Sequence, residues 1–273
     1  MSYEFDETKS YFMPPNFGYR NKPTDPVPLK TQYDYYHDAM IIFETDYDAV
    51  AALLPPGFEP ADVPTISVAH SMGRGVDMLG GAGYNLVRVN AAAKFKGKRD
   101  TAEGNFCLVM WENEFIPIMM GREILGVGKL MAEIPDLWHR GDSFGFYAAE
   151  NGFRLLEGEF SNMVEIDVGP VPPTPAPQPD YYSGWMSWKY IPNVTYEGAA
   201  LSHAVALPSA PVVKRRWKAE GGMVKFHELS FTDAPLSGQI VSMLSKLPIK
   251  KYLGVELWEG STALLLSEQR YLK

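Results

Sequence analysis

Cysteine is almost absent from this chain. Cys107 is the single cysteine among 273 residues, which excludes an internal disulfide and favours a reducing compartment. Long apolar runs are missing too, since no stretch approaches the ~20 residues that a membrane-spanning helix needs. The first 30 residues are polar and proline-rich and lack the features of a secretory signal. We therefore predict a cytoplasmic protein without a membrane partner.

Positive charge is also scarce. The formal net charge is -8, with 25 lysines and arginines against 33 acidic residues. A basic face is the usual footprint of nucleic-acid binding, so no nucleic-acid partner is predicted. The five histidines form no HExxH pair and no cysteine pair accompanies them, which argues against a metal site. The glycine-rich segment 73–83 lacks the ending of a phosphate-binding loop and is predicted to be a hairpin turn, so no cofactor is expected.

What the chain does contain is the pattern of a β-sheet protein. Residues 84–95 alternate, with Val87 and Val89 on one face and Leu86, Arg88 and Asn90 on the other. Further short strands follow at regular spacing, separated by glycine and Asp/Asn turns. We expect a β-rich α+β fold, a closed antiparallel β-barrel with a few covering helices. The domain division is an extended arm over residues 1–30 and a single barrel domain over 31–273.

One stretch stands out chemically, residues 116–134, IPIMMGREILGVGKLMAEI. It is mostly apolar but holds an Arg122–Glu123 pair and one lysine, Lys129. A lysine in such surroundings either extends its ammonium to water or stays inside, where burial disfavours the charged form. An uncharged lysine amine can add to a carbonyl group and form a Schiff base. From the residues alone, a solvated lysine is the commoner outcome.

Four segments in the same order resemble the acetoacetate decarboxylase family. GREILGVGK is similar to the GRE-x-x-x-x-PK segment of that family, and Lys129 falls on the lysine that forms the Schiff base. The family also implies a barrel fold and a homo-oligomer. The other three segments are Gly83–Tyr84 with the run to Lys98, Trp188–Asn193 (WKYIPN), and Ala234–Leu236 (APL) with Leu247–Lys250 (LPIK).

The departures from the family pattern concern the groups around the lysine. Leu130 replaces a second lysine, Leu86 replaces a glutamate, and Gly128 replaces a proline. A family arginine near the first core strand has no counterpart, and Tyr36 or His37 stands about there. We therefore expect a more apolar pocket in which burial alone keeps Lys129 uncharged.

The resemblance implies a lyase that binds a small oxo acid as a Schiff base on Lys129. The reaction is either decarboxylation of a β-keto acid or condensation of pyruvate with an aldehyde, and the lost charges favour the second. Glu123 is a candidate for proton transfer. The substrate-binding candidates are Tyr36, Tyr84, Leu86, Arg122 and Leu130. The alternative is a barrel that binds a small ligand without chemistry.

Overall fold

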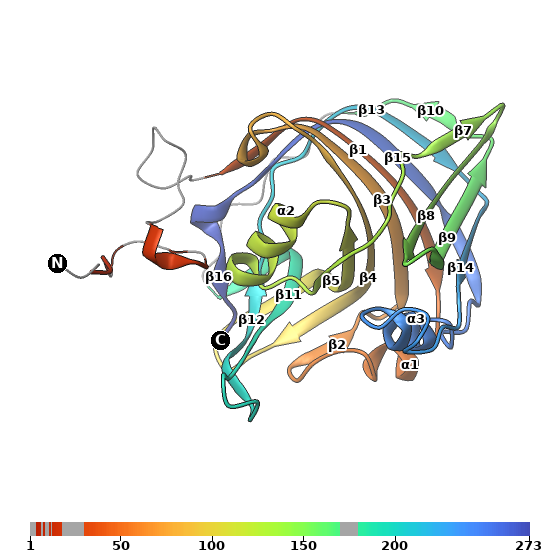
Figure 1. Cartoon of the computed structure of the whole chain (residues 1–273). Coiled ribbons are helices and arrows are strands. Elements are labelled where there is room, and N and C mark those ends of the chain that lie inside the picture. Colours follow the sequence, from red (N-terminus) through yellow and green to blue (C-terminus); the bar gives the residue numbers. More distant parts are fainter. Residues whose placement is uncertain (1–3, 7, 9–10, 12, 18–29, 170–179) are drawn as a thin grey trace.

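The computed structural model describes residues 4–6, 8, 11, 13–17, 30–169 and 180–273. A large, strongly curved β-sheet dominates them, and helix α2 lies within its bend (Figure 1). Along the sheet the strands are β10 (Val164–Ile166), β13 (Val212–Ala219), β15 (Lys251–Leu264), β1 (Thr31–Glu44), β3 (Thr65–Val76), β4 (Tyr84–Lys96), β5 (Thr101–Glu112), β11 (Tyr181–Pro192), β12 (Ala199–Ala206) and β16 (Arg270–Tyr271).

The closed antiparallel barrel is not confirmed. Within the described residues the sheet stays open, with β10 at one edge and β16 at the other. These strands have three and two residues, and such short edge strands offer few groups for further pairing. Two pairs are also parallel, β5 with β11 and β5 with the short β6 (Lys129–Met131). The β-rich class with few helices is confirmed.

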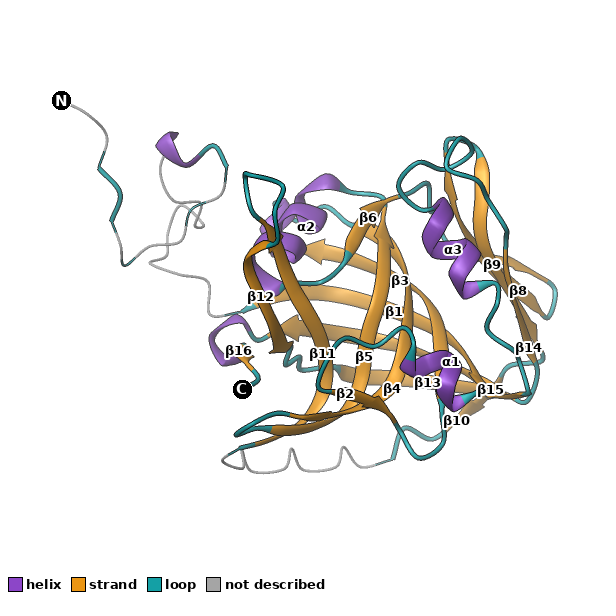
Figure 2. Cartoon of the chain, turned by 90° about the horizontal axis from the view of Figure 1, so that it is seen from below, coloured by secondary structure: helices purple, strands orange, loops and turns teal. Residues whose placement is uncertain are grey.

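A second, four-stranded sheet packs against the first. Its order is β14 (Gly222–Phe226), β9 (Phe153–Ser161), β8 (Ser143–Glu150) and β7 (Trp138–Arg140). Helix α3 (Gly238–Leu244) lies beside β9 and β14 (Figure 2). The main hydrophobic core combines side chains of both sheets, among them Ile41, Val68 and Val89 from the large sheet and Phe146 and Leu155 from the small one.

The remaining elements are short. Strand β2 (Phe58–Pro60) pairs with β4. The helices and helical turns are η1 (Pro15–Phe17), α1 (Tyr47–Ala51), η2 (Asp77–Leu79), α2 (Phe115–Met120), η3 (Gly121–Leu125) and η4 (Leu266–Glu268). Within the ranges given above, no helix is both long and apolar enough to cross a lipid bilayer.

The alternation predicted for residues 84–95 is confirmed and decides where the site lies. Val87 and Val89 of β4 point into the main core, whereas Leu86, Arg88 and Asn90 line a cavity on the other face. All five side chains are buried, because both faces of β4 are covered.

Segment 73–83 is not a loop throughout. Strand β3 continues to Val76, and the turn is confined to η2 and the following glycines. Gly73 lies within this strand, paired with Tyr36 and Tyr84. Glycine fits there because a Cβ would meet the Tyr33 ring at 2.8 Å. Most of the predicted arm over residues 1–30 lies outside the described residues, so its extended form stays a prediction. The division into this arm and a single domain over residues 31–273 also stays a prediction.

Candidate active site

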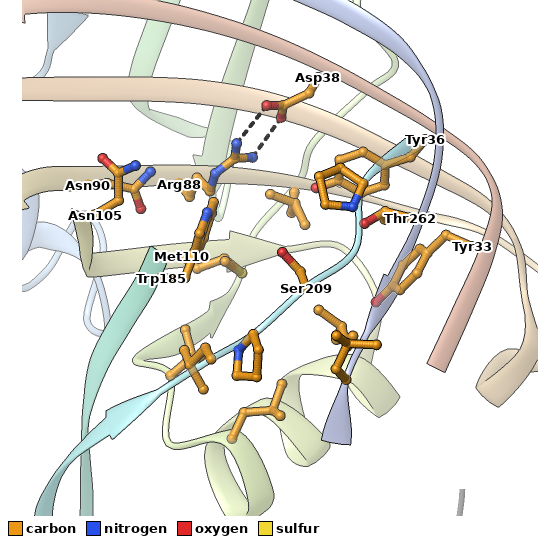
Figure 3. Close-up of a pocket in the computed structure, with 18 of the residues that line it drawn as sticks. Tyr33, Tyr36, Asp38, Arg88, Asn90, Asn105, Met110, Trp185, Ser209 and Thr262 are labelled. Carbon is orange, nitrogen blue, oxygen red and sulfur yellow. Dashed lines mark hydrogen bonds and ion pairs between the residues drawn. The ribbon is translucent and has the colours of Figure 1, made fainter. Parts of the chain in front are cut away.

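A cavity of about 330 Å³ lies between the large sheet and the segment that carries Lys129 (Figure 3). Cavities of this size commonly hold small molecules. Its wall is mostly aromatic and aliphatic, with Trp185 and Trp258 among the larger side chains. Four charged residues also line it: Asp38, Arg88, Glu112 and Lys129.

The backbone brings Lys129 into the cavity by an irregular route. Helix α2 runs into the single π-helical turn η3, which ends at Gly126 in the left-handed conformation (φ 78°). Such π-helical turns are frequent at functional sites. Lys129 then opens β6, in parallel register with Met110 of β5. Gly121 leaves room for the lysine, since a Cβ there would lie 2.3 Å from Lys129 Cε.

Lys129 is only 5% exposed, as the Schiff-base hypothesis requires. Its Nζ lies 2.7 Å from Glu112 Oε1 and also donates a hydrogen bond to the Pro117 carbonyl at 3.0 Å. Glu112 is fully buried, and its Oε2 has no hydrogen-bond partner. Burial raises the pKa of Glu112, although the nearby Lys129 charge works in the opposite direction. The pair places an amine and a carboxylate, the two groups that imine chemistry needs, in direct contact.

Glu112 lies close to Leu86, the position at which the family pattern has a glutamate. Leu86 of β4 stands directly across from Glu112 of β5 in the antiparallel register. Directly opposed residues have Cβ atoms only ~5 Å apart. A carboxylate therefore reaches this part of the cavity from the neighbouring strand.

A second buried ion pair lines the cavity beside the first. Arg88 of β4 donates to both carboxylate oxygens of Asp38 on β1, at 2.8 and 2.7 Å. Ser71 hydrogen-bonds to both residues. The Trp185 ring lies 4.8 Å from the guanidinium carbon, a cation–π distance. Figure 3 shows this pair on the cavity wall.

The pKa directions in this ion pair follow from the same contacts. Burial alone would raise the pKa of Asp38, but the charge and hydrogen bonds of Arg88 and the Ser71 hydroxyl outweigh it and lower that pKa. Burial works against the charge of Arg88 as well, and Asp38 reverses this effect and raises the arginine pKa. Both groups are therefore charged at neutral pH.

Three tyrosines also line the cavity wall. The hydroxyl groups of Tyr33 and Tyr84 lie 2.8 Å apart, and Tyr36 packs on Trp258. Burial raises the pKa of all three phenols, that of Tyr36 to about 12. They are therefore neutral hydrogen-bond donors at physiological pH.

The structure brings together four of the seven predicted site residues. Lys129, Tyr36, Tyr84 and Leu86 all line the cavity. The other three predicted residues do not line it. Their proposed roles stay predictions. Arg122 is exposed and donates to the Lys129 carbonyl at 3.0 Å, Glu123 is partly buried on η3, and Leu130 packs against the main core.

Sequence reasoning missed Glu112, Arg88 and Asp38 as residues of the cavity. A more apolar pocket was expected, and the mostly apolar wall also holds these three charged side chains. Glu112 precedes Asn113 and Glu114, a polar run typical of a turn, whereas β5 extends to include Glu112. Arg88 did carry a signal, because it shares the cavity face with Leu86. In the described residues no cluster of three or more His, Cys, Asp or Glu side chains could hold a metal ion.

The fold and the cavity together define a curved-sheet protein with a cavity whose volume suits a small molecule. The chain belongs to the acetoacetate decarboxylase family, whose model matches residues 16–271. Membership of this family supports a lyase-type activity.

Solved structures with the same fold agree with this assignment. The enduracididine biosynthesis enzyme MppR, complexed with pyruvate, is 16% identical with a TM-score of 0.65, and the match covers 92% of this chain and 95% of that chain. An acetoacetate decarboxylase structure is 14% identical with a TM-score of 0.65, covering 88% of each chain. The acetoacetate decarboxylase of Legionella pneumophila is 19% identical with a TM-score of 0.63, covering 89% and 90%. No curated protein sequence matches the chain.

Proposed function

We propose that this protein is a lyase that binds a small oxo acid as a Schiff base on Lys129. The observation that carries the proposal is the contact between the buried Lys129 amine and the buried Glu112 carboxylate at the wall of the cavity. A lysine that forms an imine needs a partner that takes and returns protons. Glu112 is in hydrogen-bond contact for both transfers.

The first stage forms the imine. Glu112 takes a proton from the ammonium, and the free amine adds to the ketone carbon of the substrate. The resulting carbinolamine loses its hydroxyl group as water, using the proton that Glu112 held. The products of this stage are water, an iminium ion on Lys129 and a Glu112 carboxylate beside it. The charges of the iminium ion and the carboxylate balance.

The iminium ion can then accept electrons from a neighbouring bond. In a β-keto acid the bond to the carboxylate breaks, carbon dioxide leaves, and the enamine carbon takes up a proton. In pyruvate Glu112 removes a methyl proton instead, and the enamine attacks an aldehyde carbonyl, whose oxygen takes the proton back. Loss of water then gives an unsaturated iminium ion, and in both reactions hydrolysis of the iminium bond by water releases the product and regenerates the Lys129 amine. A free carboxylate base supports the pyruvate reaction, and MppR has also been solved in complex with the condensation product of pyruvate and imidazole 4-carboxaldehyde.

One observation favours a second candidate, a cavity that binds a small ligand without chemistry. The Lys129–Glu112 contact is a complete ion pair, which can serve structure alone. Arginine at position 129 keeps the positive charge but cannot form an imine.

Kinetics of two variants separate the two candidates. We expect Lys129→Ala and Lys129→Arg both to abolish release of carbon dioxide from acetoacetate and condensation of pyruvate with an aldehyde. Ligand affinity that is lost in the alanine variant and only weakened in the arginine variant, with no turnover in the unmodified protein, would instead establish the binding function.

A further inference from the structure

The charges that line the cavity cancel. Its charged residues are two cations and two anions, and each cation contacts one anion: Lys129 with Glu112 and Arg88 with Asp38. The other polar lining residues are uncharged amides and hydroxyl groups, such as Asn90 and Asn105. Among the described residues, each cation on the cavity wall is therefore paired, which leaves none for the carboxylate of a second substrate.

Among the described residues, Arg88 is the one cation besides Lys129 that lines the cavity. Both of its terminal nitrogens already bind Asp38, and only the buried Nε has no partner. Asp38 binds it through both oxygens, and Ser71 joins the pair. The side chains of Arg88 and Asp38 are 4% and 5% exposed, so water does little to screen their interaction. A bidentate arginine–carboxylate contact of this kind is among the strongest hydrogen-bonded pairs in proteins.

The proposed reaction does not release another cation. When Lys129 becomes an iminium ion, Glu112 remains beside it as the counter-ion. When the enamine meets the aldehyde, Glu112 holds the methyl proton and is neutral, so a carboxylate on the second substrate would face Asp38 and the carboxylate of the bound pyruvate, with no unpaired cation among the described residues of the cavity wall to compensate. Like charges brought together in a poorly hydrated site cost several kcal/mol.

We propose that Asp38 is a specificity-determining residue that masks the charge of Arg88, so that the part of the cavity around Arg88, Trp185 and Asn105 accepts an uncharged aldehyde and rejects one that carries a carboxylate. The proposal rests on the pyruvate condensation proposed above and names the second substrate by its charge. The Trp185 ring, which contacts the Arg88 guanidinium, adds an aromatic wall to this part of the cavity.

The first test uses two aldehydes of the same shape, 4-nitrobenzaldehyde and 4-carboxybenzaldehyde, each condensed with pyruvate. Rates are divided by those of the reaction catalysed by a simple amine, which removes the difference in intrinsic reactivity. We expect the unmodified protein to prefer the nitro compound in kcat/KM by about tenfold or more. An equal or greater kcat/KM for the carboxylate compound overturns the proposal without any variant.

Variants then assign the preference to Asp38. Asp38→Asn keeps the shape but unmasks Arg88, so the ratio should shift toward the carboxylate compound by about tenfold or more. A double variant with Asp38→Leu and Arg88→Met removes both charges and should keep the preference for the nitro compound. A merely structural pair would lower both rates together in Asp38→Asn and leave the ratio unchanged.

A third measurement does not depend on the chemistry. Because Asp38→Asn exposes an unpaired guanidinium to the cavity, acetate should raise its unfolding midpoint while the isosteric acetamide does not, at constant ionic strength. Neither compound should stabilise the unmodified protein or the double variant. If no aldehyde reacts, the proposed condensation fails, and the unfolding measurement alone decides whether Asp38 masks Arg88. A shift of the unfolding midpoint by acetate that is equal in the unmodified protein, Asp38→Asn and the double variant contradicts the masking.

Discussion

At the scale of single residues, the site depends on a carboxylate that lies across the sheet from the place where the family has one. Leu86 occupies the family position, and Glu112 faces it from β5 and contacts Lys129 at 2.7 Å. A lysine kept uncharged by burial alone has no partner for its proton, whereas the buried Lys129 has a buried carboxylate in contact with its amine. The proton can move between the two groups, and this makes Glu112 the acid–base residue in our account.

The first prediction concerns that proton transfer. Glu112→Gln keeps the size of the side chain but cannot carry a proton, so we expect turnover to fall by roughly 10²- to 10⁴-fold. Steady-state kinetics with pyruvate and an aldehyde measure the effect. Glu123→Gln is the matched control, because Glu123 lies on η3 and does not line the cavity. A large loss in Glu123→Gln with little change in Glu112→Gln would move the proton-transfer role to Glu123.

At the scale of elements, side chains from other parts of the chain hydrogen-bond to the helical turn η3 that precedes Lys129. Its last carbonyl groups, those of Ile124 and Leu125, accept hydrogen bonds from Gln269, and Lys189 of β11 also donates to Ile124. Side chains that bond these free carbonyls stabilise the end of a helix. The lysine therefore sits on a well-supported turn, and the position of its amine depends on the fit inside that turn.

Gly121 provides the sharpest test of that fit. A methyl group at this position would lie 2.3 Å from Lys129 Cδ and Cε, while the backbone itself is helical (φ -62°) and suits alanine. We expect Gly121→Ala to displace the lysine and to cost roughly 1–3 kcal/mol of stability through overpacking. Imine formation should fall at least tenfold relative to Gly128→Ala, whose Cβ would meet nothing nearer than 3.8 Å. Equal rates in the two variants would contradict the role of Gly121, and thermal unfolding gives the stability change.

The elements also show what the sequence could and could not predict. The alternation in β4 was predictable because period-two patterning needs only local residues. The inclusion of Glu112 in β5, and the pairing of Arg88 with Asp38, depend on contacts between strands far apart in the chain. No local pattern carries that information, so the charged half of the site emerged only from the fold.

At the scale of the whole molecule, the two sheets enclose a histidine at their interface. His70 of β3 is fully buried, packs against the Phe146 ring of β8 and hydrogen-bonds the Pro135 carbonyl through Nε2. Burial lowers its pKa from 6.5 to about 4. The folded protein therefore holds this imidazole neutral at a pH where the unfolded chain would protonate it.

The sign of the stability change follows from that shift. Because the folded pKa is depressed, the unfolded chain binds more protons between pH 6.5 and 4, so stability falls as the pH is lowered through this window. The full effect of such a shift is roughly 3 kcal/mol. Denaturant unfolding at a series of pH values should show this loss reduced in His70→Gln. The exposed His203→Gln should keep the profile of the unmodified protein, and an identical profile in all three proteins would contradict the assignment.

The oligomeric state and the cellular location remain predictions. The family resemblance implies a homo-oligomer, and the sequence predicts a cytoplasmic protein. Sedimentation of the full chain measures the first directly. A monomer at micromolar concentration would contradict it.

The most direct test of the central claim is borohydride trapping. The protein is incubated separately with pyruvate and with acetoacetate, reduced, and digested for peptide mass mapping. The account predicts an adduct on Lys129 and none on the half-buried Lys189, with Lys129→Arg unlabelled. The better-labelling ketone would indicate which reaction the site performs. A folded protein that is labelled by neither compound, or that is labelled at another lysine, would contradict the account.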